Sequence, residues 1–282
     1  GSIYLALTLV CALGYWVAGM PGFDAVAHAM TTIATGGFST SDASIGVFDN
    51  WAIDSIAIVF MITGSLPFVL YLQATRGRPE SLWRDSQVRW FLAIVLAVVS
   101  LISLSLYLSQ ELALGVSIRA AAFNAVSVIT GTGYSTAAFD TWGTFPLILF
   151  FAMMFIGGCA GSTAAGMKVV RAALVFRHSI RELRRLIYPN GVFALRFGKH
   201  VVNDRVLQAV WGFVGVYITL SVIFTLLFTT TGMDLTTAVS AVAASINNLG
   251  VGIGQVGGGF ANITDEAKWM MTLLMLLGRL EI

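Results

Sequence analysis

Glycines set among hydroxyl-bearing residues recur at three places in this sequence. Residues 30–40 read M-T-T-I-A-T-G-G-F-S-T, and residues 126–136 read V-S-V-I-T-G-T-G-Y-S-T. Residues 245–252, S-I-N-N-L-G-V-G, form a looser third copy. In every copy an isoleucine stands four residues before a glycine, and these glycines are Gly37, Gly133 and Gly250. The repeat predicts one function shared by three loops.

Such loops can present backbone carbonyl groups as ligands for a cation. Glycine allows backbone angles that other residues rarely adopt, so carbonyl oxygens can converge and replace the water shell of a dehydrated cation. A short helix that ends at the loop directs the negative end of its dipole there, which also favours a cation. The alternative is that the glycines serve close packing of membrane helices, but packing requires neither a repeated loop nor repeated flanking residues.

Membrane helices are the elements that must position these loops. The chain has 282 residues, of which 57% are hydrophobic and 11% charged, and its mean hydropathy is +0.85. Soluble domains carry roughly 25% charged residues, and several apolar runs here approach the ~20 residues that cross a bilayer. The sequence therefore predicts an integral membrane protein. Residues 3–18 lack the basic start and the cleavage site of a signal peptide.

Other kinds of site are not favoured by the sequence. Cys11 and Cys159 lie far apart in apolar sequence, which indicates small buried side chains and no disulfide framework. The histidines fall in different segments and give no metal-ligand spacing. No nucleophile–base pair stands out in the apolar segments. We therefore expect no enzymatic activity and no cofactor in the chain.

Long apolar segments alternate with short ones. The long segments, each expected to span the membrane, are residues 3–19, 51–72, 90–108, a stretch that begins at 142, 206–228 and 269–282. The short ones, each expected to be a helix of about half the bilayer core, are residues 25–33, 117–129 and 236–246. Each short helix runs into one glycine loop. The repeating unit is therefore span, short helix, glycine loop, span.

The distribution of charge predicts that the glycine loops face outward. Two connections, residues 76–89 and 168–205, hold 13 of the 16 lysines and arginines, and basic connections stay in the cytoplasm. Each short helix and its loop must then enter and leave by the outer face. Non-helical backbone at that depth survives only inside protein or along a water-filled path. Three such loops in one orientation predict a shared pore.

The motifs resemble those of a known family. I-A-T-G-G-F-S-T, I-T-G-T-G-Y-S-T and N-N-L-G-V-G, with G-G-C-A-G-S-T-A-A-G-M-K and the closing G-R-L-E, are similar to the TrkH type of the Trk/Ktr/HKT potassium transporters. The resemblance covers the whole chain. It implies an all-α membrane protein in which four units of helix, pore helix, filter loop and helix surround one central ion pore pseudo-symmetrically. This chain holds only three filter loops, so we expect a fragment.

The resemblance also implies a division of the chain. We expect the second of four pore repeats at residues 1–75, a cytoplasmic basic loop at 76–89, and the third repeat, with a broken second helix, at 90–186. A cytoplasmic basic connection is expected at residues 187–205, followed by a truncated fourth repeat at 206–282. The first repeat would then be absent from this chain.

The family's filter can be carried over residue by residue. The resemblance implies that backbone carbonyls bind K⁺ in the three loops, at Thr35, Gly36, Gly37, Gly131, Thr132, Gly133, Asn248, Leu249 and Gly250. The loops are simpler than T-V-G-Y-G. They do not by themselves indicate how the protein ranks potassium, rubidium and sodium.

A glycine-rich interruption follows the apolar stretch after residue 142. It is too rich in glycine to form a regular helix, and it lacks the Lys-Ser/Thr step of a phosphate loop. The resemblance implies an intramembrane gate under the filter, formed by Gly157, Gly158, Gly161, Ser162, Thr163, Gly166 and Arg279. The alternatives are a packing kink and, for Arg279, a structural ion pair, although Glu281 does not share its helix face.

The resulting hypothesis is potassium uptake across the bacterial inner membrane, passive or coupled to H⁺ or Na⁺. The partners implied are membrane lipid, a second copy in a homodimer and a cytosolic nucleotide-binding regulatory subunit, with no nucleic acid. The basic residues of 168–205 fit either topology alone or docking of that subunit. The alternative function is a secondary transporter for a small polar solute, which predicts inverted repeats; the units here share one orientation.

Overall fold

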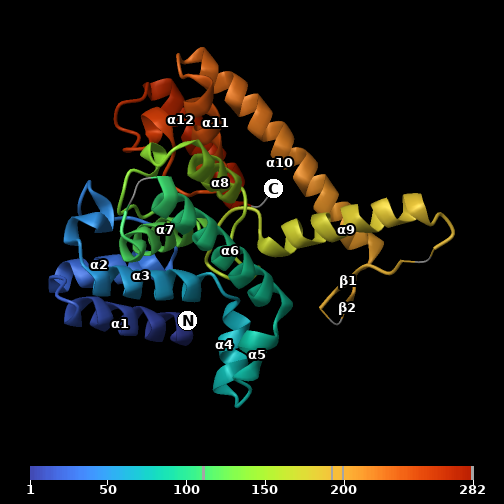
Figure 1. Ribbon diagram of the computed structural model, residues 1–282, viewed down its shortest axis with the longest axis horizontal. Helices are drawn as coiled ribbons and strands as arrows, with labels where there is room; N and C mark the ends of the chain where they lie inside the picture. The colour runs from blue at the N-terminus through green and yellow to red at the C-terminus, as the bar shows by residue number, and fades with distance from the viewer. Residues whose placement is uncertain (110–111, 192, 199, 281–282) are drawn as a thin grey trace.

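The computed structural model describes residues 1–109, 112–191, 193–198 and 200–280. Helices dominate the described chain, which confirms the predicted fold class (Figure 1). They are α1 (Ser2–Val17), α2 (Gly22–Ile33), α3 (Trp51–Gly64), α4 (Phe68–Thr75), α5 (Glu80–Arg84), α6 (Ser86–Ser109), α7 (Leu114–Ile129), α8 (Thr144–Met154), α9 (Val169–Ile187), α10 (Asp204–Thr230), α11 (Leu235–Ile246) and α12 (Asp265–Arg279). An antiparallel hairpin pairs β1 (Arg196–Phe197) with β2 (His200–Val201), and single 3₁₀ turns are η1 (Ser44–Phe48), η2 (Phe139–Thr141) and η3 (Gly254–Val256).

Three units of the same build follow one another along the chain. In each, one helix leads to a short helix, a glycine loop and another helix, and the units are α1–α2–α3, α6–α7–α8 and α10–α11–α12. In Figure 1 the first unit lies at the lower left, the third at the top and the second between them. α3 packs on α7, and α8 packs on α11. The last helix of one unit therefore contacts the short helix of the next.

The short helices are buried most deeply toward their C-terminal ends. α2 and α11 have 12 residues each, while α7 has 16 and begins at Leu114, three residues before its expected start. Asp234 caps α11 by accepting a hydrogen bond from Thr237 N (3.3 Å). The last turns of α7 and α11, residues 126–129 and 241–246, are buried. The loops that follow therefore start from fixed positions.

The expectation of one continuous helix at residues 51–72 is wrong. α3 ends at Gly64, α4 begins at Phe68, and the two helices are bent by 93°. Pro67 is the physical reason, because proline lacks a backbone N–H and its ring clashes with the preceding helical turn. By contrast, the expected interruption after α8 is present, since helix does not resume until Val169.

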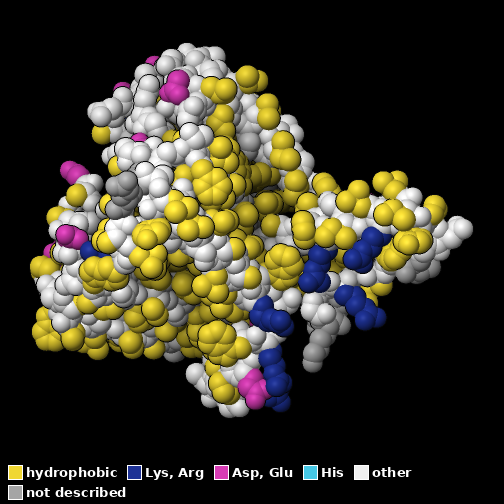
Figure 2. All heavy atoms as spheres, viewed as in Figure 1, with side chains coloured by type: hydrophobic (Ala, Val, Ile, Leu, Met, Phe, Trp, Pro, Cys, Tyr) yellow, Lys and Arg dark blue, Asp and Glu magenta, His cyan; other side chains and the backbone are white. Residues whose placement is uncertain are grey.

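The surface is that of a membrane protein. Hydrophobic side chains cover most of the face shown in Figure 2, and Val17 and Leu226 are 81% and 63% exposed. α6 and α10, with 24 and 27 residues, are long and apolar enough to cross a membrane, and the bent pair α3–α4 could form a third span. Lysines and arginines gather around α9 and α4–α5, away from most of the acidic side chains (Figure 2). This separation agrees with the orientation predicted from charge.

Candidate functional site

The three glycine loops lie beside one another in chain order. A Cβ atom added to Gly37 would overlap the backbone carbonyl oxygen of Thr132, and one added to Gly133 would overlap that of Leu249. Thr132 and Leu249 each precede the glycine of their own loop, so the same contact is made twice. Among the described residues, a Cβ atom on Gly250 would meet no heavy atom within 4 Å. The first loop is therefore in close contact with the second and the second with the third, while space remains beside the glycine of the third.

The backbone of all three loops follows one pattern. Positive φ angles of 65°, 82° and 81° belong to the loop glycines Gly37, Gly133 and Gly250. Two residues earlier φ is again positive, at 49°, 71° and 50° for Thr35, Gly131 and Asn248. This region is unfavourable for threonine and asparagine. The surrounding structure must therefore hold both residues in place.

Each loop is closed onto its short helix by the same hydrogen bond. The residue before the loop glycine donates its N–H to a carbonyl five residues earlier. The three bonds are Gly36 N to Thr31 O (2.8 Å), Thr132 N to Ser127 O (3.0 Å) and Leu249 N to Ala244 O (2.8 Å). The carbonyl groups that face the neighbouring loops are thus fixed by the ends of the short helices.

Tyr134 joins the second loop to the first unit. Its hydroxyl donates to His28 O (3.1 Å) and lies 2.5 Å from Thr31 Oγ1. Its carbonyl accepts from Ser127 Oγ (2.6 Å). Phe38, the matching residue of the first loop, has no hydroxyl and is exposed. The second loop is therefore held from two units at once.

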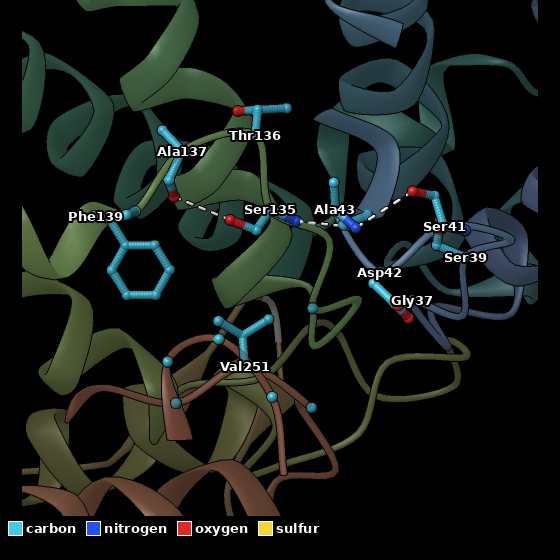
Figure 3. Close-up of a pocket in the computed structure, with 18 of the residues that line it drawn as sticks. Gly37, Ser39, Ser41, Asp42, Ala43, Ser135, Thr136, Ala137, Phe139 and Val251 are labelled. Carbon is cyan, nitrogen blue, oxygen red and sulfur yellow. Dashed lines mark hydrogen bonds between the residues drawn. The ribbon is translucent and has the colours of Figure 1, made fainter. Parts of the chain in front are cut away.

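A cavity of about 690 Å³ opens beside the loop glycines (Figure 3). Its lining comes from all three units, and Figure 3 shows residues of the first two loops on opposite sides with Val251 of the third between them. Ser44 Oγ accepts a hydrogen bond from Ser135 N (3.2 Å), which joins the first two loops. Asp42 and Asp140 also line the cavity. Carboxylates at such a mouth raise the local concentration of cations.

Apart from Arg279, which ends α12, the residues predicted to form a gate lie in the non-helical stretch between α8 and α9. We call residues 157–166 the gate segment. Cys159 N donates to Ser65 O (3.0 Å), and Gly161 O accepts from Phe68 N (3.0 Å). Both partners lie at the break between α3 and α4. Gly157 and Gly158 are buried, Gly161 is exposed, and Ser162, Thr163 and Gly166 are partly buried.

The gate segment also reaches the ends of two short helices. Thr163 Oγ1 lies 2.9 Å from Ile33 O and 3.0 Å from Gly64 O, so its single hydroxyl hydrogen is shared between them. Ile33 is the last residue of α2. On the other side, a Cβ atom on Gly166 would lie 2.8 Å from Oδ1 of Asn247, which caps α11. The gate segment therefore contacts the bases of the first and third loops.

A glycine near the end of each unit's last helix stands three residues after a methionine, at Gly64, Gly157 and Gly278. A Cβ atom on Gly64 or Gly278 would crowd the carbonyl oxygen of Ile33 or Ile246, the isoleucines of the loop repeat. On Gly157 it would instead meet the gate segment. This M-x-x-G repeat could have been found in the sequence. In the second unit the gate segment, and not the end of the short helix, makes this close contact with the glycine.

Arg279 follows Gly278 and is exposed at the end of α12. Gly278 and Gly166 line one small pocket, so the backbone next to Arg279 lies near the gate segment. Among the described residues the Arg279 side chain has no ion pair within 4 Å, and Glu281 lies outside the described residues. Its role at the gate stays a prediction.

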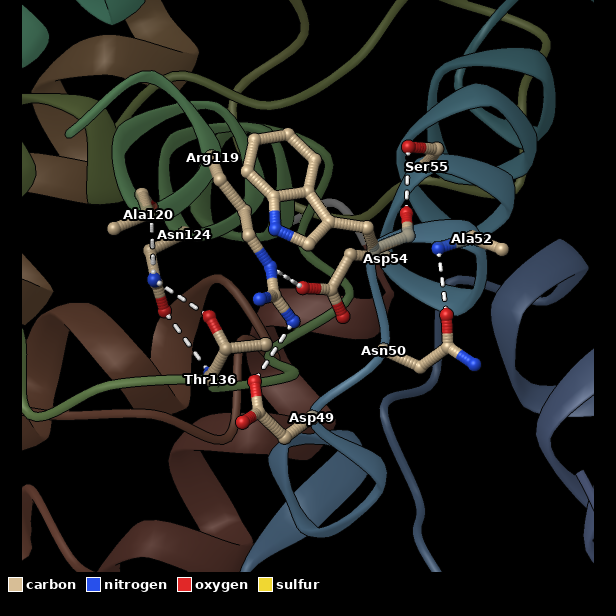
Figure 4. Close-up of polar contacts among 10 residues, drawn as sticks. Asp49, Asn50, Ala52, Asp54, Ser55, Arg119, Ala120, Asn124 and Thr136 are labelled. Carbon is tan, nitrogen blue, oxygen red and sulfur yellow. Dashed lines mark hydrogen bonds and ion pairs between the residues drawn. The ribbon is translucent and has the colours of Figure 1, made fainter. Parts of the chain in front are cut away.

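An ion-pair network, not predicted from the loop motifs, joins the first two units (Figure 4). Arg119 on α7 donates from Nε to Asp54 Oδ2 (2.6 Å) and from Nη2 to Asp49 Oδ1 (3.0 Å). Its guanidinium carbon lies 5.2 Å from the centre of the Trp51 ring. Asp54 is only 2% exposed, within the apolar helix α3. Asp54 and Arg119 are isolated charges in apolar segments, and such charges indicate a buried partner. That the two pair with each other depends on how the units pack.

The comparisons with known proteins agree on one family. The family model for TrkH, described as a cation transport protein, matches residues 2–282. This chain belongs to the TrkH family. The Trk system potassium uptake protein TrkH of Salmonella typhimurium is 40% identical over 283 residues, which cover 99% of this chain and 58% of that protein. TrkI of Halomonas elongata is 38% identical over 286 residues, covering 100% of this chain and 58% of that protein.

A solved structure matches the fold of this TrkH-family chain. The crystal structure of the potassium transporter TrkH from Vibrio parahaemolyticus is similar with a TM-score of 0.95 and 41% identity. The match covers 100% of this chain and 61% of that chain. The resemblance stated from the motifs is therefore confirmed. The chain spans about three fifths of the length of these relatives.

Proposed function

We propose that this chain supplies three of the four loops of a potassium-selective filter in an uptake protein of the bacterial inner membrane. The observation that carries the proposal is the close approach of Gly37 and of Gly133 to the carbonyl oxygen of the next loop. A ring built by this rule has its fourth loop between Gly250, which no heavy atom approaches, and Gly36 of the first loop. The relatives, named as potassium uptake proteins, are longer than this chain and have room for that loop.

The K⁺ ligands in this proposal are backbone carbonyl oxygens. They belong to Thr35, Gly36, Gly37, Gly131, Thr132, Gly133, Asn248, Leu249 and Gly250. The shared φ pattern supports equivalent roles for the three loops, and carbonyl oxygens suit a dehydrated monovalent cation. The C-terminal ends of α2, α7 and α11 add partial negative charge beneath the loops. We assign the three pore repeats to residues 1–75, 90–186 and 206–282, with basic connections at 76–89 and 187–205.

The gate segment and Arg279 would control passage below the filter. Thr163 and Gly166 contact the bases of two loops from different units, so displacement of the segment would change the inner end of the path. No covalent step is required. A homodimer, a cytosolic nucleotide-binding subunit and coupling to H⁺ or Na⁺ belong to the same proposal, since they follow only from the family resemblance.

The filter is tested by replacing Gly133 with serine in the full-length protein. Gly133 has φ of 82°, and any Cβ atom there would overlap Leu249 O. We expect Gly133→Ser to lower the ratio of potassium to sodium uptake roughly tenfold, which equals about 1.4 kcal/mol of differential binding. Gly115→Ser is the control, because nothing lies within 4 Å of that position on α7. An unchanged ratio for Gly133→Ser in proteoliposomes would remove Gly133 from the filter.

A further inference from the structure

A pocket lined by four arginines lies beside α9, outside the candidate pore. Its volume is about 570 Å³, and its lining includes Arg177, Arg181 and Arg184 of α9 and Arg196 of β1. The three α9 arginines are spaced i, i+4 and i+7, so they share one face of the helix. Figure 2 shows basic side chains gathered on this side of the molecule. We call this site the arginine pocket.

The positive charge of the arginine pocket is only partly neutralised. Arg181 lies 3.1 Å from Glu182 and 3.9 Å from Asp204. Glu182 also forms an ion pair with Arg185, which does not line the pocket. In the part of the chain that the structure describes, no carboxylate lies within 4 Å of the Arg177, Arg184 or Arg196 guanidinium. The pocket therefore favours an anion.

The arginine pocket lies at the cytoplasmic ends of two membrane spans. Arg177 packs over the ring of Trp90, five residues into α6, at 5.7 Å. Arg181 approaches Asp204, the first residue of α10. Tryptophan is enriched where a span meets the headgroup layer, and the basic ends of spans face the cytoplasm. The pocket therefore lies at the depth of the inner-leaflet headgroups.

The α9 helix also presents apolar side chains next to the arginine row. Phe176, Leu183 and Ile187 are 56%, 60% and 70% exposed, and their spacing of i, i+7 and i+11 places them on one neighbouring face. Ile180, Phe193 and Leu195 line the pocket itself. A helix with a basic row beside an exposed apolar row is typical of the boundary between headgroups and acyl chains.

We propose that the arginine pocket binds the phosphate of an anionic phospholipid of the inner leaflet. Guanidinium groups match phosphate oxygens with paired hydrogen bonds, and basic pockets beside membrane helices on the cytoplasmic side suit such headgroups. The apolar lining distinguishes a lipid from free phosphate, because it offers contacts that only a lipid can use. The binding does not depend on potassium transport.

One consequence rests on the proposed gate. Val169, the first residue of α9, donates its N–H to Gly158 O of the gate segment (3.1 Å). A headgroup that holds α9 would therefore bias the position of the gate segment, and anionic lipid would change the potassium flux. Lipid binding without any effect on flux would count against the gate and not against the pocket.

The test uses the full-length protein in mild detergent with dioleoylphosphatidylglycerol as the probe. We expect this lipid to raise the unfolding temperature and to remain bound in native mass spectrometry, while dioleoylphosphatidylcholine does neither. Arg184→Gln should raise the half-saturating lipid concentration roughly fivefold, the effect of one arginine at an anionic membrane surface. Arg185→Gln is the matched control, because this neighbour pairs with Glu182 outside the pocket, and it should leave the concentration unchanged.

Three results would overturn the proposal. Equal effects of Arg184→Gln and Arg185→Gln would reduce the site to general surface charge. Equal stabilisation by inorganic phosphate alone would make it a site for a soluble anion. Loss of a protein partner or of the dimer on Arg184→Gln, with lipid retention unchanged, would make it a protein interface.

Discussion

At the scale of single residues, an ion pair joins α7 to α3, and the matching position on α11 carries no charge. Arg119 stands 14 residues before its loop glycine (133 − 119), and Thr236 stands 14 before Gly250 (250 − 236). Arg119 pairs with Asp54 where α7 packs on α3. The equivalent residue on α11, Thr236, lines an apolar cavity of about 290 Å³ where α11 packs on α8. The contact of α3 with α7 is thus held by an ion pair, whereas the contact of α8 with α11 has an uncharged residue at the equivalent position.

Removal of one partner of this ion pair should destabilise the protein strongly. Asp54 is buried and the Arg119 side chain is 20% exposed, so Asp54→Ala leaves a poorly solvated guanidinium. We expect a loss of about 3 kcal/mol, measured by denaturation of the full-length protein in detergent. Replacing both residues, as Asp54→Leu with Arg119→Met, should cost less than Asp54→Ala. Arg84→Gln, which breaks an exposed pair with Glu80, should change stability by less than about 0.5 kcal/mol.

If the stability losses of Asp54→Leu alone and of Arg119→Met alone simply added in the double variant, the two residues would act independently. The network in Figure 4 would then contribute packing but no coupling between the units.

At the scale of elements, the close approach of helix ends to the short helices needs glycine. A Cβ atom on Gly278 would overlap Ile246 O, whereas one on Gly212 in α10 would meet nothing within 4 Å. Both are helical glycines without positive φ. We expect Gly278→Ala to destabilise the protein by about 1–3 kcal/mol through overpacking, and Gly212→Ala to be neutral or slightly stabilising. Similar unfolding temperatures for both variants would show that α12 can shift away from α11 freely.

Thr163 is the contact of the gate segment that can be changed most cleanly. Thr163→Val keeps the shape but removes the hydroxyl that reaches Ile33 O and Gly64 O. Loss of about 1 kcal/mol of hydrogen bonding should raise potassium flux into proteoliposomes roughly fivefold if the segment closes the path. Ser162→Ala is the control, because that hydroxyl bonds only within the segment, to Cys159 O. A flux unchanged by Thr163→Val would favour a packing kink.

Deletion within the gate segment and Arg279→Ala test the same gate more drastically. Arg279 contributes a positive charge near the end of α12, and at ~5 Å in an effective dielectric near 20 its repulsion of K⁺ would be about 3 kcal/mol. Solvent reduces this, so we expect roughly a tenfold rise in potassium flux with selectivity retained. Unchanged or lower flux in both folded variants would leave Arg279 with a structural role.

At the scale of the whole molecule, charge predicts the orientation in the membrane, and labelling checks it. Ala43 beside the cavity and Arg84 in α5 are exposed, while the native Cys11 and Cys159 are buried. A membrane-impermeant thiol reagent added to intact cells should label Ala43→Cys and spare Arg84→Cys, with any cysteines outside this chain removed. Labelling of Arg84→Cys alone would invert the molecule and place the cavity on the cytoplasmic side.

The sequence by itself determined the membrane setting, the threefold unit and the loop glycines. Hydropathy and a repeated Ile-x-x-x-Gly are local properties, and positive φ at Gly37, Gly133 and Gly250 follows from residues that tolerate it. The break in the helix expected at residues 51–72 could have been predicted from Pro67, but the apolar composition on both sides of it favoured a continuous helix.

Only the tertiary structure decided which atoms of separate units meet. Three contacts join segments far apart in sequence. Gly37 and Gly133 approach the carbonyl oxygen of the next loop closely, Arg119 pairs with Asp54, and the gate segment bonds to the break between α3 and α4. A periodic pattern says which face of a helix is apolar, but not which neighbour covers it. That choice depends on how side-chain volumes fit together when the helices pack, a property of the assembled units and not of any one segment.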